Sequence, residues 1–359
     1  MRLSRLKHYI KLYMPYKWVL EYEEKRDFFA QYFAWKETNP HVVFDTESKF
    51  ETIVAVQGLG YSGSGAIIDL LREYDDCLVH GMAEGGSKAK PAADDFGEIV
   101  LIKDIGGLMD LDSVIDTPAK IYGDAALKRF AYRASHDVLY RLGGKYKNYI
   151  FAFFDALVDD FSRDIPGSVA GLIPRIKDNR FVMQECTKDK FYQLCQQFLY
   201  SIFNMQYNGD SRYLVLDQAV YVTTQGVRYC RNFIPNMKNI VVWRDPRDRY
   251  VIAKRQNIEW MPHDTVEQFI EHTKSLYRPM DINSKEYLAI RFEDLILDYD
   301  KTIAQIEEYL NLGEHKRPMS CLDTSISCKN IGMWENAEDI PQEDFEKIYE
   351  ELKEYCYER

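Results

Sequence analysis

The chain has 359 residues, which is enough for one large α/β domain or two smaller ones. Its 46 Lys and Arg residues against 57 Asp and Glu give a net charge of −11, and this acidic balance argues against a nucleic-acid partner. The seven cysteines include no C-x-x-C pair, so the sequence predicts neither a disulfide framework nor a zinc site, and a reducing compartment suits it.

The N-terminal region, residues 1–40, has the pattern of two helices ending near Asn39-Pro40. No stretch of the sequence approaches the roughly 18 unbroken apolar residues of a membrane span, and charges interrupt the basic start too often for a secretory signal. We therefore expect a cytoplasmic protein without a transmembrane segment. The basic, aromatic residues 1–18 leave open a weak contact with a membrane surface, against the alternative of a solvated helix packed on the domain.

A glycine-rich turn follows the first predicted strand, which begins at Thr52, and an apolar helix follows the turn up to Leu71. Such a turn leaves backbone N–H groups unpaired at a helix N-terminus, and this arrangement favours an anion, usually a phosphate. The sequence therefore predicts an anion site formed by Gly60, Tyr61, Ser62, Gly63, Ser64 and Gly65.

Two familiar phosphate loops fit this turn only in part. A nucleotide triphosphatase loop, G-x-x-x-x-G-K-[ST], requires a lysine where Ser64 stands and a hydroxyl where Gly65 stands, which disfavours a P-loop kinase. A dinucleotide loop, G-x-G-x-x-G, matches Gly58, Gly60 and Gly63. It also needs an acidic residue at the end of the next strand, and that strand has none.

Strands and helices alternate along the rest of the chain. Residues 84–120 have the composition of a long loop, and residues 124–206 are predicted to be largely helical. Further strands are predicted at Cys77–Gly81, Tyr213–Leu216, Asn239–Trp243 and Tyr287–Ile290, and a terminal helix at residues 342–357. This alternation favours an α/β fold, three-layered and P-loop-like, with a central, mostly parallel sheet and helices on both faces.

The predicted domain organisation has two parts. Residues 1–45 form an N-terminal helical segment, and residues 46–359 form the α/β domain. Within that domain, a helical insertion at about 105–210 is expected to cover the ligand edge of the sheet, on the acceptor side.

Four motifs occur in a fixed order: Ser62-Gly63-Ser64, Arg244-Asp245-Pro246-Arg247-Asp248, Phe292-Glu293-Asp294-Leu295, and Gly332-Met333-Trp334. Together they resemble the PAPS-dependent sulfotransferases, especially bacterial and glycan-modifying members. The resemblance implies PAPS as the sulfuryl donor, PAP as the product, a hydroxyl acceptor and no metal. A saccharide or another small molecule is the expected acceptor, and its identity and the oligomeric state stay open.

The resemblance also implies roles for particular residues. The turn at 60–65 would hold the 5′-phosphosulfate, and Arg244 would bind the 3′-phosphate with Arg247 nearby. The loop from Ser325 to Trp334 would fold over the 3′-phosphate and the adenine, with Ser327 and Lys329 as hydrogen-bond donors.

Glu84 is the candidate catalytic base, as in glycan-modifying members, and His80 is its rival. Asp245 and Asp248 are expected to orient Arg244 and to start the helix that follows it. Three further cations on that helix are predicted to form a solvated face: Arg249, Lys254 and Arg255.

Three ligands usual in the family are absent. Tyr61 replaces the cation of the turn, Gln218 lies near the place of a lysine, and Ile252 replaces a serine. One explanation is that lysines of the long loop supply the missing charge: Lys88, Lys90 or Lys103. The alternative is a non-catalytic protein that binds PAP or another nucleotide on the same fold.

Overall fold

The computed structural model describes residues 16–38, 40–80, 121–123, 132, 146–161, 181–183, 188–218 and 222–358. By packing, the chain forms two units: residues 1–44 with 113–187, and residues 45–112 with 188–359. The chain therefore leaves the second unit and returns to it. The sequence-based boundaries at 45 and at about 105–210 remain predictions.

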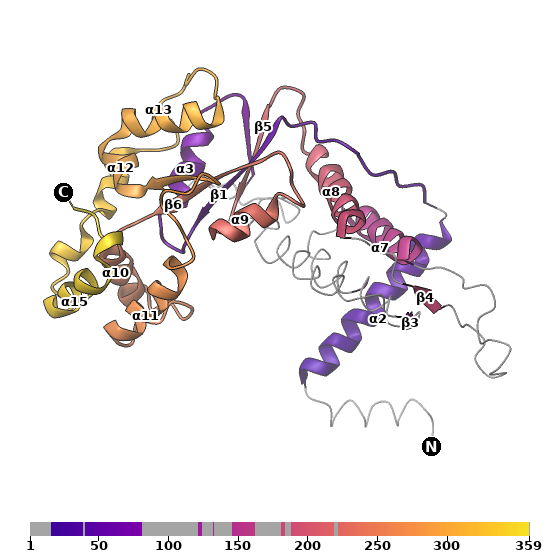
Figure 1. Ribbon diagram of the computed structural model, residues 1–359, viewed down its shortest axis with the longest axis horizontal. Coiled ribbons are helices and arrows are strands. Elements are labelled where there is room, and N and C mark those ends of the chain that lie inside the picture. Colours follow the sequence, from indigo (N-terminus) through magenta and orange to yellow (C-terminus); the bar gives the residue numbers. More distant parts are fainter. Residues whose placement is uncertain are drawn as a thin grey trace. The chain divides into compact units, whose positions relative to one another are not determined.

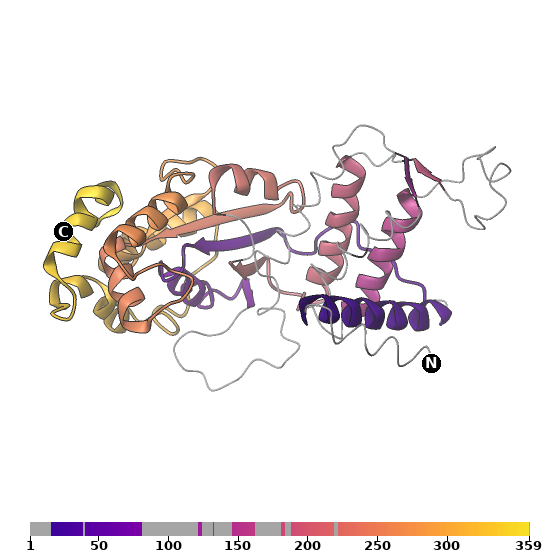
Figure 2. The same cartoon turned by 90° about the horizontal axis from the view of Figure 1, so that it is seen from below.

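The first unit contains two helices, α2 (Tyr16–Glu37) and α7 (Lys147–Phe161), and a short antiparallel pair, β3 (Ile121–Gly123) and β4 (Phe181–Met183). Figure 2 shows α2 as one continuous helix, in indigo. Buried Phe28 of α2 contacts the rings of Phe151 and Phe154 of α7, and both Tyr32 and Lys36 bond to the Asp155 carboxylate. Aromatic packing with one polar cluster thus joins the two helices.

The second unit is built on a five-stranded parallel sheet with the order β2-β5-β1-β6-β7. The strands are β1 (Thr52–Gly58), β2 (Cys77–His80), β5 (Tyr213–Asp217), β6 (Met237–Trp243) and β7 (Leu288–Arg291). Gly58 of β1 lies opposite Val242 of β6, and Val56 lies opposite Asp217 of β5. This register places the ends of three strands at one edge, where ligands bind in such sheets.

Helices cover both faces of this sheet. The first set consists of α3 (Ser64–Leu71), α12 (Phe292–Leu297) and α13 (Tyr299–Leu310), and the second of α9 (Thr224–Cys230), α10 (Pro246–Gln256) and α11 (Val266–Tyr277). Figure 1 shows the two sets on opposite sides of strands β1 and β6. Side chains of β6 alternate accordingly, because Ile240 and Val242 pack in one apolar cluster and Val241 and Trp243 in another.

The other elements of this unit are α8 (Lys188–Asn204), α14 (Thr324–Ser327), α15 (Gln342–Leu352) and three short 3₁₀ helices, η6 (Cys328–Asn330), η7 (Met333–Asn336) and η8 (Lys353–Tyr355). Buried Phe345 and Ile348 of α15 join an apolar cluster with residues of α10 and α11. The C-terminal segment thereby packs beside the helix that follows Arg244.

The predicted α/β fold class is confirmed, and so is each predicted strand to within one or two residues. The largely helical prediction for 124–206 was incomplete, since strand β4 lies within it; three residues are too short to produce a period-2 pattern. Among the helices that the structure describes, none is both long and apolar enough to cross a membrane.

Candidate functional site

The glycine-rich turn joins β1 to α3 through two residues with left-handed backbone conformations. Tyr61 has φ = 62°, and Gly63, the N-cap of α3, has φ = 90°. A Cβ atom at Gly63 would lie 2.3 Å from the buried ring of Phe292, so both the backbone and the space require glycine. Phe292 belongs to the third sequence motif, which is thus packed directly under the turn.

Three of the turn's backbone donors have no acceptor in the described part of the chain. The N–H group of Ser62 donates to the Leu59 carbonyl over 2.8 Å, but no such bond is formed by the N–H groups of Gly60, Tyr61 or Gly63. These donors lie next to the N-terminus of the eight-residue helix α3. In other proteins, unpaired N–H groups at a helix N-terminus bind anions.

The two serines of the turn differ in their surroundings. Ser62 is buried, and its Oγ has no hydrogen-bond partner; a Cβ atom at Gly58 would lie 1.9 Å from it, so Gly58 makes room for this hydroxyl. Ser64 Oγ accepts a 2.8 Å hydrogen bond from Gln218 Nε2, and Gln218 Oε1 accepts one from the Gly58 N–H. Gln218 therefore supports the turn through neutral contacts.

Arg244 directly follows β6 and lies next to the turn. It is 5% exposed, Nη1 donates to the Tyr61 carbonyl over 3.2 Å, and Nη2 donates to the Asn330 carbonyl. Its guanidinium lies 5.1 Å from the centre of the Phe292 ring, and Nε is buried without a partner. Burial lowers the pKa of Arg244. One side chain thus connects the turn to the 324–330 segment.

Three buried carboxylates surround the start of α10. Asp245 caps the helix by accepting from the Arg247 N–H, Asp248 accepts from the N–H groups of Gly332 and Trp334, and Glu293 accepts from the Asp245 N–H. Burial raises the pKa of Asp248 to about 6 and that of Glu293 to about 7. Asp245 starts the helix as expected, whereas neither aspartate bonds to Arg244: Asp248 holds the Gly-x-Trp loop instead.

Arg247 points away from the turn. Its guanidinium pairs with Asp245 at 2.6 Å, donates to the Tyr357 carbonyl and lies 4.0 Å from the centre of the Trp334 ring. These contacts tie the helix to the C-terminal segment. A role for Arg247 in holding PAP remains a prediction.

The expectation of a solvated face for Arg249, Lys254 and Arg255 is wrong for Arg249. That side chain is fully buried, and its Nε donates to the Gly60 carbonyl over 3.2 Å. Arg255 is exposed and pairs with Asp339, and Lys254 is partly exposed. The helical spacing contained the signal, because Arg249 shares a face with buried Ile252 and Ala253.

An aromatic pair stands beside the turn, and nothing in the sequence pattern indicated it. The rings of Tyr61 and Trp260 are stacked, with centroids 6.1 Å apart and planes 7° apart. Both side chains are exposed, and the Trp260 ring packs directly on Gly60. Tyr61 and Trp260 therefore present an aromatic surface beside the turn.

The remaining candidates have different positions. Ser327 ends α14 and is partly exposed, and Lys329, in η6, is exposed. They belong to the segment that Arg244 contacts through Asn330. His80 ends β2, opposite Leu216 of β5. Glu84 and the three candidate lysines of the long loop lie outside the described residues. Ile252 is buried in an apolar cluster.

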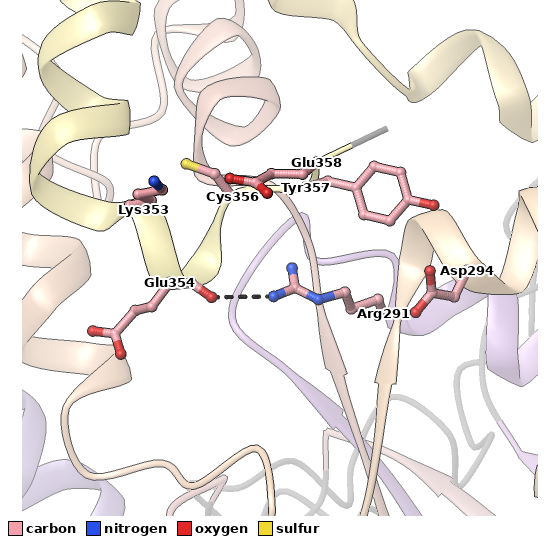
Figure 3. A pocket seen from close by; sticks show the side chains of 7 residues that line it. All are labelled: Arg291, Asp294, Lys353, Glu354, Cys356, Tyr357 and Glu358. Atoms are coloured by element: carbon pink, nitrogen blue, oxygen red, sulfur yellow. Dashed lines mark hydrogen bonds between the residues drawn. The ribbon is translucent and has the colours of Figure 1, made fainter.

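A separate open pocket lies past the end of β7, and Figure 3 shows its lining. Arg291 donates there to the backbone carbonyls of Glu354 and Tyr355. None of the predicted site residues lines this pocket. In the described part of the chain, no group of three or more His, Cys, Asp or Glu side chains is arranged to hold a metal ion.

No protein-family model matches the sequence, and no curated protein does. Similar solved structures include the sulfotransferase domain of the Synechococcus PCC 7002 olefin synthase, which is 13% identical over 89% of this chain and 100% of that one, with a TM-score of 0.35. Sulfotransferase STF9 from Mycobacterium avium is 13% identical over 86% and 76%, with a TM-score of 0.34. Similarity this distant defines no activity for the chain.

Replacing Gly63 tests the close packing of the turn. Gly63→Ala adds both left-handed strain and a clash with Phe292, so the free energy of unfolding should fall by about 2–5 kcal/mol. Gly209→Ala is the matched control, since Gly209 has φ = 99° with open space around it, and its cost should be about 1–2 kcal/mol. Urea denaturation measures both, and equal losses would contradict the packing described.

Replacing Glu293 tests the burial of its carboxylate. Because its folded pKa of about 7 exceeds the ordinary 4.5, the folded state binds the proton more tightly, and the free energy of unfolding decreases as pH rises between these values. Glu293→Gln removes this titration. Relative to wild type, its free energy of unfolding should therefore gain about 1–3 kcal/mol between pH 4.5 and 7. Urea denaturation at several pH values measures the gain; exposed Glu346→Gln is the control, and a Glu293→Gln curve parallel to wild type would disprove the effect.

Proposed function

We propose that the chain is a sulfotransferase that moves a sulfuryl group from PAPS to a hydroxyl of an acceptor, with PAP as the second product. The observation that carries this proposal is the position of Arg244 between two segments, the glycine-rich turn and the 324–330 segment. PAP has two phosphate ends, and two anion-binding segments joined by one arginine suit such a ligand.

The residues of the site fit this donor in charge and in hydrogen bonding. The free N–H groups of Gly60, Tyr61 and Gly63 and the unpartnered hydroxyl of Ser62 suit the 5′-phosphosulfate. Arg244 and exposed Lys329 supply positive charge near the proposed 3′-phosphate position. None of these donors needs a metal ion to bind an anion.

PAPS supplies an activated sulfuryl group: the bond from sulfur to the bridging oxygen breaks while a bond from sulfur to the acceptor oxygen forms. The acceptor proton passes to a base, and the negative charge of the leaving oxygen stays on PAP. The turn's part is to hold the anion in line through its N–H donors, which act most strongly where water is excluded.

A saccharide is the proposed acceptor, and Glu84 is the proposed base with His80 as its rival. His80 is the last residue of β2, whose carboxyl end lies at the same edge of the sheet as the turn, and Glu84 comes four residues later in the sequence. A carboxylate suits proton removal from a sugar hydroxyl, provided that its surroundings raise its pKa toward neutrality.

The role of Arg244 in binding PAP is tested by calorimetry. Arg244→Ala should weaken PAP binding about 10- to 100-fold, since it removes a charged donor. Arg255→Ala alters an exposed arginine in the last turn of α10, the helix that follows Arg244, and should leave affinity unchanged. Lys329→Ala, which alters only an exposed side chain, should also weaken PAP if the 324–330 segment binds it. Unchanged affinity in both Arg244→Ala and Lys329→Ala would disprove the assignment.

The base is tested by transfer of radiolabelled sulfur from PAPS to a panel of oligosaccharides. Glu84→Gln should keep the affinity for PAP and lose most of the turnover, by about 100-fold or more. His80→Gln serves as the comparison. Turnover that survives in Glu84→Gln but not in His80→Gln would transfer the role to His80, and turnover that survives in both would remove each of them as the base.

A further inference from the structure

We propose that Arg249 is the buried cation that substitutes for the one missing from the turn at Tyr61, and that it positions the turn for a sulfate- or diphosphate-bearing anion. The inference rests on the proposed function and names the residue that gives its anion site a charge. Arg249 acts through the Gly60 carbonyl and does not itself contact the ligand, because its side chain is fully buried. It is therefore a positioning residue.

In the part of the chain that the structure describes, the contacts of Arg249 are with uncharged groups. Nε donates to the Gly60 carbonyl over 3.2 Å, Nη1 donates to Tyr277 Oη over 3.0 Å, and Nη2 is buried without a partner. The guanidinium also lies 5.4 Å from the centre of the Tyr277 ring. No carboxylate in the described part of the chain forms an ion pair with it. The neighbouring arginine Arg247, by contrast, has the Asp245 carboxylate at 2.6 Å.

A buried cation without a counter-ion is costly, because the charge has lost its water and gained no opposite charge. An anion bound close by would supply the missing opposite charge and offset this cost. The group next to Arg249 that is open to a ligand is the turn itself, whose N–H donors at Gly60, Tyr61 and Gly63 lack acceptors. The cost of burying Arg249 is thus offset when an anion occupies the turn.

The positive charge of Arg249 acts on groups of neighbouring elements. The pKa of His272 on α11 is lowered, mainly by burial and in addition by the positive charge of Arg249. The same charge lowers the pKa of Arg244, although burial contributes more. Arg244 and Arg249 hold adjacent carbonyls of the turn, those of Tyr61 and Gly60. With both carbonyls held by buried arginines, the turn's N–H groups are left to a ligand.

The test compares Arg249→Met with Arg255→Met, which removes the same charge from the exposed face of the same helix. Calorimetry measures the binding of PAP and of inorganic pyrophosphate, and urea denaturation measures the unfolding midpoint without ligand. Arg249→Met should lower both affinities about tenfold or more. Its unfolding midpoint should equal or exceed that of wild type, since an uncompensated charge has been removed. Arg255→Met should change neither quantity, and Arg249→Lys should recover part of the affinity.

Two results would overturn the inference. The first is an Arg249→Met variant that binds pyrophosphate and PAP within twofold of wild type. The second is a variant that unfolds at a lower midpoint or does not fold, because Arg249 would then stabilise the fold as an ordinary buried side chain. Wild-type protein that binds pyrophosphate in an Arg249-dependent way but does not distinguish PAP from AMP would refute the proposed function alone.

Discussion

The site depends on charges buried at the start of α10. Arg244, Arg247 and Arg249 lie there together with Asp245, Asp248 and Glu293, and all six side chains are largely removed from water. Buried charges are costly unless hydrogen bonds, opposite charges or a bound ligand compensate them. Two hydrogen bonds therefore depend on this cluster of buried charges. Asp248 accepts one from the Gly-x-Trp loop, and Arg244 donates the other to the turn.

The register of the parallel sheet determines which segments meet at this cluster. Since Gly58 lies opposite Val242, the chain that leaves β1 and the chain that leaves β6 emerge side by side. Asp217 of β5 lies opposite Val56, which places Gln218 on the other side of the turn. Segments almost two hundred residues apart in the sequence thus meet at the proposed anion site.

Much of this fold was predictable, because its signals are local. The apolar run from Thr52 and the glycines after it identified a strand and a turn, and Arg244-Asp245-Pro246 identified a helix start with proline at its first position. The strand β4 was missed because it has only three residues. Within the site, the sequence indicated that Arg244 and the turn belong together only through a family resemblance.

The contacts that sequence could not indicate depend on tertiary packing. Arginine is usually a surface residue, so residue type alone did not indicate that Arg249 is buried. Its hydrogen bond to the Gly60 carbonyl is seen only in the folded structure. The stack of Tyr61 on Trp260 joins residues from two separate loops, which no periodicity connects. Gln218 supports the turn with neutral hydrogen bonds, and buried Arg249 bonds to the Gly60 carbonyl of the same turn.

The most direct measurement is the affinity of the wild-type protein for PAP against AMP by calorimetry, with Mg·ATP and NAD as further comparisons. The two nucleotides PAP and AMP differ by the 3′-phosphate, which the account assigns to Arg244 and the 324–330 segment. It predicts that PAP binds at least about 100-fold more tightly than AMP, a difference of roughly 2.8 kcal/mol. Equal affinities for PAP and AMP, or a preference for Mg·ATP, would contradict the proposed function.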